Sequence, residues 1–266
     1  MSDFRIYGES APDLVPDSEG SPKLLREPRR LAASAGAAWI GQAWGLFTRR
    51  WGLWVGMSFV MLLITTVVSM LPLVGFLSNF LTLFFAGGMM LAAAALAEND
   101  DLEFVYLFGG FQHKFKELLI LTLLYFLVLL LVVFVFVVVM YLTGTNISDW
   151  DSEQPSVAAM AMYGWIILAG FAVLVPVSMM MWFATVLTVL DDVAPWQAMK
   201  MSFQGCVRNI LPFIVYGLVW LGLSLVVGLL AMGLVMLFDW VWLPLVVMSA
   251  LMILVVTPWT MLTVYT

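Results

Sequence analysis

The sequence has few of the residues from which most catalytic and metal sites are built. Its 266 residues include one cysteine, Cys206, and one histidine, His113, and only 11% of them are charged. A single cysteine excludes an intramolecular disulfide, and with one histidine it leaves no cluster for zinc or haem. The charged residues lie in the tail and the connections rather than within the apolar stretches. We therefore expect no catalytic residue, no metal, no cofactor and no enzymatic activity.

Long apolar stretches take the place of polar clusters. Hydrophobic residues make up 64% of the chain, and the mean hydropathy is +1.05. Residues 118–142 contain no charge, and as a helix they would extend roughly 37 Å, enough to cross a bilayer. Soluble proteins are about a quarter charged, so this composition predicts a multi-pass membrane protein.

Six apolar stretches are separated by proline, glycine or charged residues. They predict an all-α polytopic membrane helix bundle of six transmembrane helices, in one domain. Pro72 and Gly75 join the first two spans in a hairpin, and Pro176 predicts a kinked or broken fourth span near Leu174. The predicted spans are 54–71, 76–96, 118–142, 160–190, 211–237 and 243–264.

Three polar connections precede the three hairpins, at residues 33–50, 98–117 and 191–209. Each combines aromatic side chains with bases, so each predicts a short interfacial amphipathic helix on the cytoplasmic side. The same arrangement therefore appears three times in parallel, unlike the inverted repeats common in secondary transporters. Trp44, Phe47 and Arg50 align with Phe108, Phe111 and Lys114, and more loosely with Phe203 and Arg208.

The basic residues are distributed unevenly along the chain. All eleven Lys and Arg residues precede the first span or follow the second and fourth spans, and the outer connections have none. This bias predicts that both termini are cytoplasmic. Residues 1–32 lack a secretory signal and apolar periodicity, so we expect a disordered cytoplasmic tail followed by a six-span transmembrane domain, residues 33–266.

Four glycines near the first span form a candidate helix-packing face. If the helix is continuous, they fall within an arc of about 60°, and the neighbouring tryptophans point away from it. Small residues let two helix backbones approach, so the face predicts contact with another helix or with a second copy of the chain. Ordinary glycine enrichment in membrane helices is the alternative. The residues are Gly41, Gly45, Gly52 and Gly56.

Six bases beside aromatic residues form a candidate contact surface for anionic lipids or for an acidic protein partner. Each such base is worth about 1 kcal/mol against an anionic leaflet. The alternative is that these bases only set the topology. Nucleic-acid binding has no basis in the sequence. The six bases are Arg49, Arg50, Lys114, Lys116, Lys200 and Arg208.

Two short motifs carry a resemblance to known proteins. The first is WGLFTRR before the first span, and the second is P-x-x-AM-x-x-SF-x-x-x-x-RN-x-x-P, formed by Pro195, Ala198, Met199, Ser202, Phe203, Arg208, Asn209 and Pro212. The chain resembles uncharacterised bacterial six-span inner-membrane proteins and, more distantly, the membrane domain of some glycerophosphodiester phosphodiesterases. The resemblance implies a bacterial inner-membrane bundle. It does not imply phosphodiesterase chemistry, which in those enzymes belongs to a separate soluble domain.

These observations favour a non-enzymatic inner-membrane module that organises protein partners or lipids. Coupled transport is disfavoured because no ionisable residue lies deep within a span. The alternative function is a passive or lipid-handling transporter, in which a kinked fourth span with Thr185 and Thr188 opens a lateral groove without charges.

Overall fold

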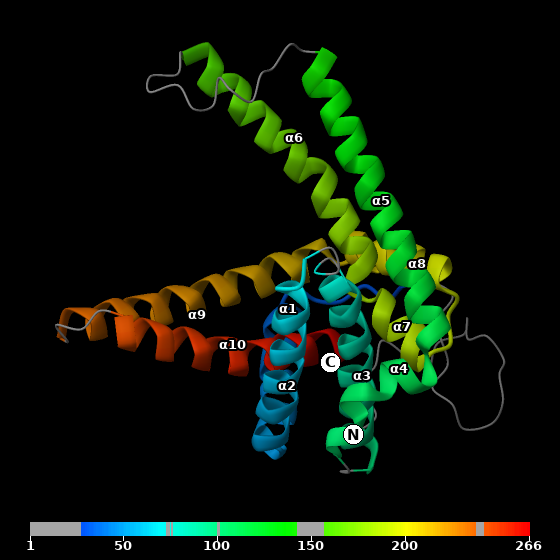
Figure 1. The fold of residues 1–266 in the computed structure, drawn as a ribbon, viewed down its shortest axis with the longest axis vertical. Helices are drawn as coiled ribbons and strands as arrows, with labels where there is room; N and C mark the ends of the chain where they lie inside the picture. The colour runs from blue at the N-terminus through cyan, green and yellow to red at the C-terminus, as the bar shows by residue number, and fades with distance from the viewer. Residues whose placement is uncertain (1–27, 73–74, 76, 100–101, 143–156, 238–241) are drawn as a thin grey trace.

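The computed structural model describes residues 28–72, 75, 77–99, 102–142, 157–237 and 242–266. All regular structure in these residues is helical (Figure 1), which confirms the all-α prediction for this part of the chain. Most of the predicted tail and the predicted outer connections around residues 143–155 and 239 lie outside it. The elements are α1 (Ala35–Arg49), α2 (Trp51–Ser69), α3 (Leu77–Asn99), η1 (Phe104–Phe108), α4 (Gly109–His113), α5 (Phe115–Leu142), α6 (Val157–Trp182), α7 (Ala184–Leu190), α8 (Pro195–Arg208), α9 (Ile210–Leu237) and α10 (Trp242–Tyr265).

Five helical stretches are long and apolar enough to cross a membrane. They are Trp51–Ser69, Leu77–Glu98, Phe115–Tyr141, Gly164–Leu190 and Ile210–Gly233. The sixth predicted span lies in α10, where the apolar stretch found, Met252–Tyr265, is shorter. The chain is thus an all-helical multi-pass membrane protein, and the count of six spans stays a prediction.

The helices form three units, each made of a short helical segment followed by a hairpin. The first unit is α1–α2–α3, the second is η1–α4–α5–α6–α7, and the third is α8–α9–α10. The short segment of each unit packs on the hairpin of the preceding unit: η1 and α4 on α3, and α8 on α6 and α7. The first segment, α1, packs on α9 and α10 of the third unit, so the three units close into a cycle.

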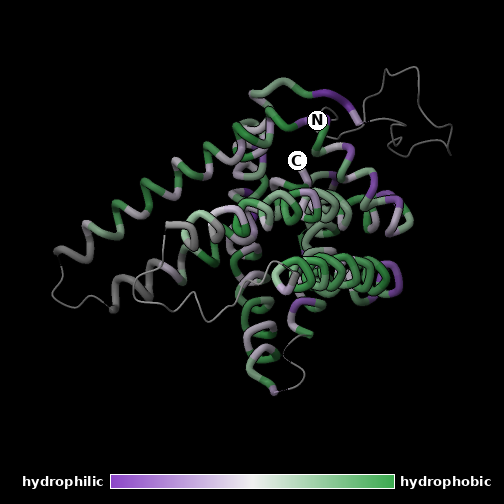
Figure 2. Tube along the Cα trace, turned by 90° about the horizontal axis from the view of Figure 1, so that it is seen from above, coloured by the Kyte–Doolittle hydropathy of each residue, from purple (hydrophilic) through white to green (hydrophobic). Residues whose placement is uncertain are grey.

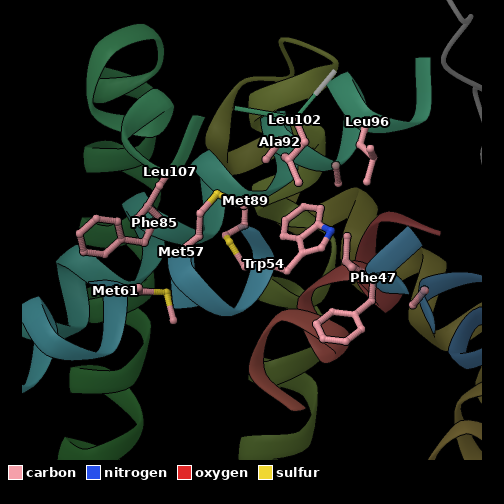
Figure 3. Packing of buried hydrophobic residues seen from close by; sticks show 13 residues of the cluster. Phe47, Trp54, Met57, Met61, Phe85, Met89, Ala92, Leu96, Leu102 and Leu107 are labelled. Carbon is pink, nitrogen blue, oxygen red and sulfur yellow. The ribbon is translucent and has the colours of Figure 1, made fainter. Parts of the chain in front are cut away.

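Helix α3 lies at the centre of this cycle. One buried cluster joins α3 to α1, α2, η1 and α10, and Figure 3 shows Trp54 of α2 among Met57, Met89 and Leu102 in this cluster. A second buried cluster joins α3, through Phe84, to α5, α7 and α8. We refer to the two clusters together as the hub. All three short segments therefore meet at the hub.

The hairpins leave the hub in different directions. In Figure 1, α5 and α6 rise toward the top, whereas α9 and α10 extend to the left. Figure 2 shows the strongest purple on the side of the hub away from the end of the α9–α10 hairpin.

The fourth span is broken, but not where the sequence predicted. Helix α6 continues through Pro176 to Trp182, and α7 begins at Ala184. The Ser202 hydroxyl of α8 donates to the Met179 carbonyl at 2.6 Å and accepts the Phe183 N–H at 2.9 Å. In an unbroken helix the Phe183 N–H would bond the Met179 carbonyl directly. The inserted hydroxyl explains the break, which lies at Phe183 rather than near Leu174. A kink at Pro176 stays a prediction.

Candidate interaction surface at the three helix junctions

Each short helical segment meets its hairpin at one residue with the same backbone conformation. The φ and ψ angles are −139° and 45° at Arg50, −131° and 30° at Lys114, and −120° and 34° at Asn209. In all three, the carbonyl accepts the N–H four residues later, so it begins the helix that follows. Those N–H groups belong to Trp54, Leu118 and Phe213, at 3.2, 3.0 and 3.2 Å.

This geometry corrects the alignment of the repeats by one residue. Arg50 and Lys114 correspond to Asn209 rather than to Arg208. With this alignment an aromatic residue lies six positions before the junction in every unit: Trp44, Phe108 and Phe203. Positions seven before and seven after the junction are buried in every unit, so the repeat is a packing pattern. These positions are Ala43, Leu107 and Ser202 before the junction, and Met57, Leu121 and Tyr216 after it.

The second junction binds a carboxylate of the same chain. Lys114 forms an ion pair with Asp192, which lies in the connection between α7 and α8. The Lys114 side chain is 19% exposed and that of Asp192 is 79% exposed, so the pair lies at the surface. Asp192 has a φ of 55°, a left-handed conformation that Asp tolerates better than most residues. An exposed pair of this kind contributes about 0–1 kcal/mol.

The other five predicted contact bases are exposed, and they too lie near the ends of the hairpins that join the hub. Arg49 and Arg50 end α1, Lys116 lies in the first turn of α5, and Lys200 and Arg208 lie on α8. The Lys200 ammonium lies 5.0 Å from the centre of the half-exposed Trp196 ring, a cation–π contact. The structure therefore distributes the bases over three junctions, and their contact with anionic lipid stays a prediction.

The third junction carries an amide in place of a base. Asn209 is 8% exposed, and its side chain bonds the backbone of Arg29 and Leu31 in the segment that precedes α1. Asn209 is part of the second sequence motif, but no role was predicted for it from the sequence. The signal was an Asn at the start of an apolar span, where the other two units have Arg and Lys.

Three further motif residues of α8 are buried against the rest of the protein. Ala198, Met199 and Ser202 are almost fully buried. The Cys206 thiol is buried among them, 3.6 Å from the Met179 carbonyl, and burial raises its pKa to about 12 although the Ser202 hydrogen bond opposes the rise. The thiol therefore stays protonated at neutral pH, and a protonated thiol is a poor nucleophile.

Three of the four glycines in the predicted face contact no other element among the described residues. Arg50 interrupts the helix, so Gly41 and Gly45 belong to α1, and Gly52 and Gly56 to α2. No described atom lies within 4 Å of a Cβ added at Gly41, Gly45 or Gly52, and at Gly56 the nearest is the Phe104 ring at 3.6 Å. The face stays a prediction for contact with a second copy or another protein.

Other glycines, which the sequence reasoning missed, allow the close helix contacts. A Cβ at Gly88 of α3 would overlap the backbone oxygen of Leu107, and one at Gly110 of α4 would overlap that of Phe84. A Cβ at Gly36 of α1 would overlap the backbone oxygen of Pro212 and lie 2.8 Å from another backbone atom. The Gly-Gly pairs at 87–88 and 109–110 were the available sequence signal.

Comparison with known proteins gives one partial match. A probable inner membrane protein of Burkholderia thailandensis is 48% identical to this chain over 58 residues, which cover 22% of each chain. No family model matches the chain, and no solved structure matches it. The similarity is therefore to part of a probable inner membrane protein, and the resemblance to the phosphodiesterase membrane domain stays a prediction.

Proposed function

We propose that this protein is a non-enzymatic module of a bacterial inner membrane that organises anionic lipids or acidic protein segments at its hub. Five helices of suitable length and the similarity to a probable inner membrane protein support the location. The membrane-spanning hairpins then anchor the module, and the short segments present its contact surface. We place these segments at the inner membrane surface, with both termini cytoplasmic.

The repeated junction is the observation that carries this proposal. Each unit ends its short segment with bases at the point where the apolar hairpin begins, the depth at which phospholipid headgroups lie. One of these bases, Lys114, already pairs with a carboxylate, so the junction geometry is compatible with an anionic group. Exposed aromatic rings such as Trp51 and Trp196 accompany the bases, as expected at a membrane interface.

Charge removal at three exposed bases tests the proposal. The variant Arg49→Gln, Lys116→Gln, Lys200→Gln should carry less phosphatidylglycerol and cardiolipin through gentle purification, measured by lipid mass spectrometry. The matched control Arg49→Lys, Lys116→Arg, Lys200→Arg keeps all charges and should retain wild-type amounts. Equal lipid in the two triple variants and the wild type would show that these bases set topology alone.

The alternative of a lipid-handling groove in the fourth span gains no support from the residues that suggested it. Thr185 and Thr188 lie on α7 and are 7% and 0% exposed, and α7 itself packs into the hub. They therefore do not line an open lateral path in this structure. The break at Phe183 is bridged by Ser202, which further ties α7 to α8.

The proposed topology has a separate test. The Thr266 hydroxyl donates to the Trp39 carbonyl at 3.2 Å, so the end of the chain lies beside α1 at the hub. Reporter fusions after Asn146 and Asp239 should give an external signal, and a fusion after Thr266 an internal one. An external signal at Thr266 would contradict the proposed orientation.

A further inference from the structure

The Asn209 side chain at the third junction bonds the backbone of the segment that precedes α1. The Asn209 amide nitrogen donates to the Arg29 carbonyl at 3.0 Å and to the Gly205 carbonyl at 2.9 Å. Its amide oxygen accepts the Leu31 N–H at 2.8 Å. The side chain thus bonds the residues before and after Arg30, as one residue of a parallel strand bonds its neighbour. Only backbone atoms of the bound segment take part in these two bonds, so the bonds do not depend on the side chains of that segment.

We propose that Asn209 is a latch, which holds residues 29–31 of the same chain and closes the cycle between the first and third units. The inference goes beyond the proposed lipid or partner contacts and does not depend on them. The same backbone position in the other units holds Arg50 and Lys114, which suit an anion. A neutral amide with both a donor and an acceptor suits a peptide group instead.

The occupant is fixed by the short connection to α1. Leu31 lies four residues before Ala35, where α1 begins, and α1 itself is bound to the third unit. The Trp259 indole N–H donates to the Ile40 carbonyl at 3.0 Å, close to the contact of Thr266 with Trp39. Because the chain's own α1 is docked beside the site, its own residues 29–31 are the segment within reach.

A disulfide can report whether the latch is closed. A Cβ at Gly205 lies 3.9 Å from the Cβ of Pro28, inside the 3.5–4.5 Å range found in disulfides. The variant Pro28→Cys, Gly205→Cys in a Cys206→Ala background should therefore form a crosslink on mild oxidation of the full-length protein in membranes. The control pair Pro28→Cys, Gly41→Cys should not crosslink, because no described atom lies near Gly41.

Removal of the hydrogen bonds to residues 29 and 31 then tests the role of Asn209. Leu31→Pro deletes the N–H that Asn209 accepts, and we expect crosslinking to slow roughly tenfold relative to Leu31→Ala, which keeps the N–H. Asn209→Ala deletes the bonds to both Arg29 and Leu31, so it should slow crosslinking at least as much as Leu31→Pro. The two changes together should slow it little more than Asn209→Ala alone, since both open the same latch. The thermal unfolding midpoint of each variant shows that the bundle remains folded.

Two outcomes would overturn the latch. Equal crosslinking rates in Leu31→Pro and Leu31→Ala would show that the bond from Leu31 to Asn209 does not hold the segment. Fully additive effects of Leu31→Pro and Asn209→Ala would show that the residues act independently. Lipid retention plays no part in either measurement, so failure of the latch and failure of the proposed function are distinguishable.

Discussion

Helices α3 and α5 are both long and apolar, yet the structure uses them in opposite ways. Half of the most apolar stretch of α3 is buried within the protein, whereas none of the corresponding stretch of α5 is buried. Helix α5 is the more hydrophobic of the two by sequence, with long runs of Leu, Val and Phe. Helix α3 contains Gly87, Gly88 and a run of alanines, which let other backbones approach it.

The comparison shows that the more hydrophobic of two membrane helices need not be the one at the centre of the protein. Lipid is as apolar as Leu, so a Leu-rich helix gains little from contact with another helix. Close packing between small residues provides the attraction instead. Accordingly only Leu118 and Leu121 of α5 are fully buried in the hub, and most of the large side chains beyond them are exposed.

The strongest way to break this comparison is to fill the closest contact of α3. In Gly88→Leu the new side chain would meet the backbone oxygens of Leu107 and Tyr106, the latter 2.6 Å from its Cβ. Because backbone cannot move aside as a side chain can, we expect a loss of at least about 3 kcal/mol. The matched control is Gly222→Leu in α9, where no described atom lies near. Thermal unfolding in detergent should show a lower midpoint for Gly88→Leu alone.

A second pair of variants compares the two helices directly by shortening one large side chain in each. Met89 of α3 is 1% exposed, and Met89→Ala should cost about 2 kcal/mol or more, because it leaves a cavity in the hub. Leu130 of α5 is 62% exposed, and Leu130→Ala should change the unfolding midpoint little. Similar losses for both variants would contradict the assignment of α5 as a lipid-facing helix.

Much of the helical organisation was predictable from the sequence, because long uncharged stretches have few alternatives to helix. The predicted spans 118–142 and 211–237 agree with α5 and α9 within a few residues at each end. The three-unit repeat was also visible. Its register was one residue off, because the sequence comparison matched a base with a base, whereas the backbone conformation equates Asn209 with Arg50 and Lys114.

The contacts between helices could not be predicted in the same way. The break at Phe183 depends on Ser202, nineteen residues later, and the latch at Asn209 depends on a segment 178 to 180 residues earlier. Periodicity within one helix carries no information on such partners. The glycine face stays a prediction, but its four members lie on two helices, whereas the sequence analysis assumed one helix that continues through Arg50.

The smallest expected effect concerns two equivalent hydroxyls, eight residues after the first and second junctions. Ser58 of α2 is 0% exposed and its hydroxyl has no partner among the described residues, whereas the Thr122 hydroxyl of α5 donates to the Leu118 carbonyl at 2.7 Å. A buried hydroxyl without a partner is destabilising, so Ser58→Ala should raise the free energy of unfolding by about 0.5–1 kcal/mol. Thr122→Val removes a bond that is made, and should lower it by about 0.5 kcal/mol. Unfolding in detergent compares the two variants with wild type. If both variants lost a similar free energy of unfolding, the difference in hydrogen bonding between Ser58 and Thr122 would not affect stability.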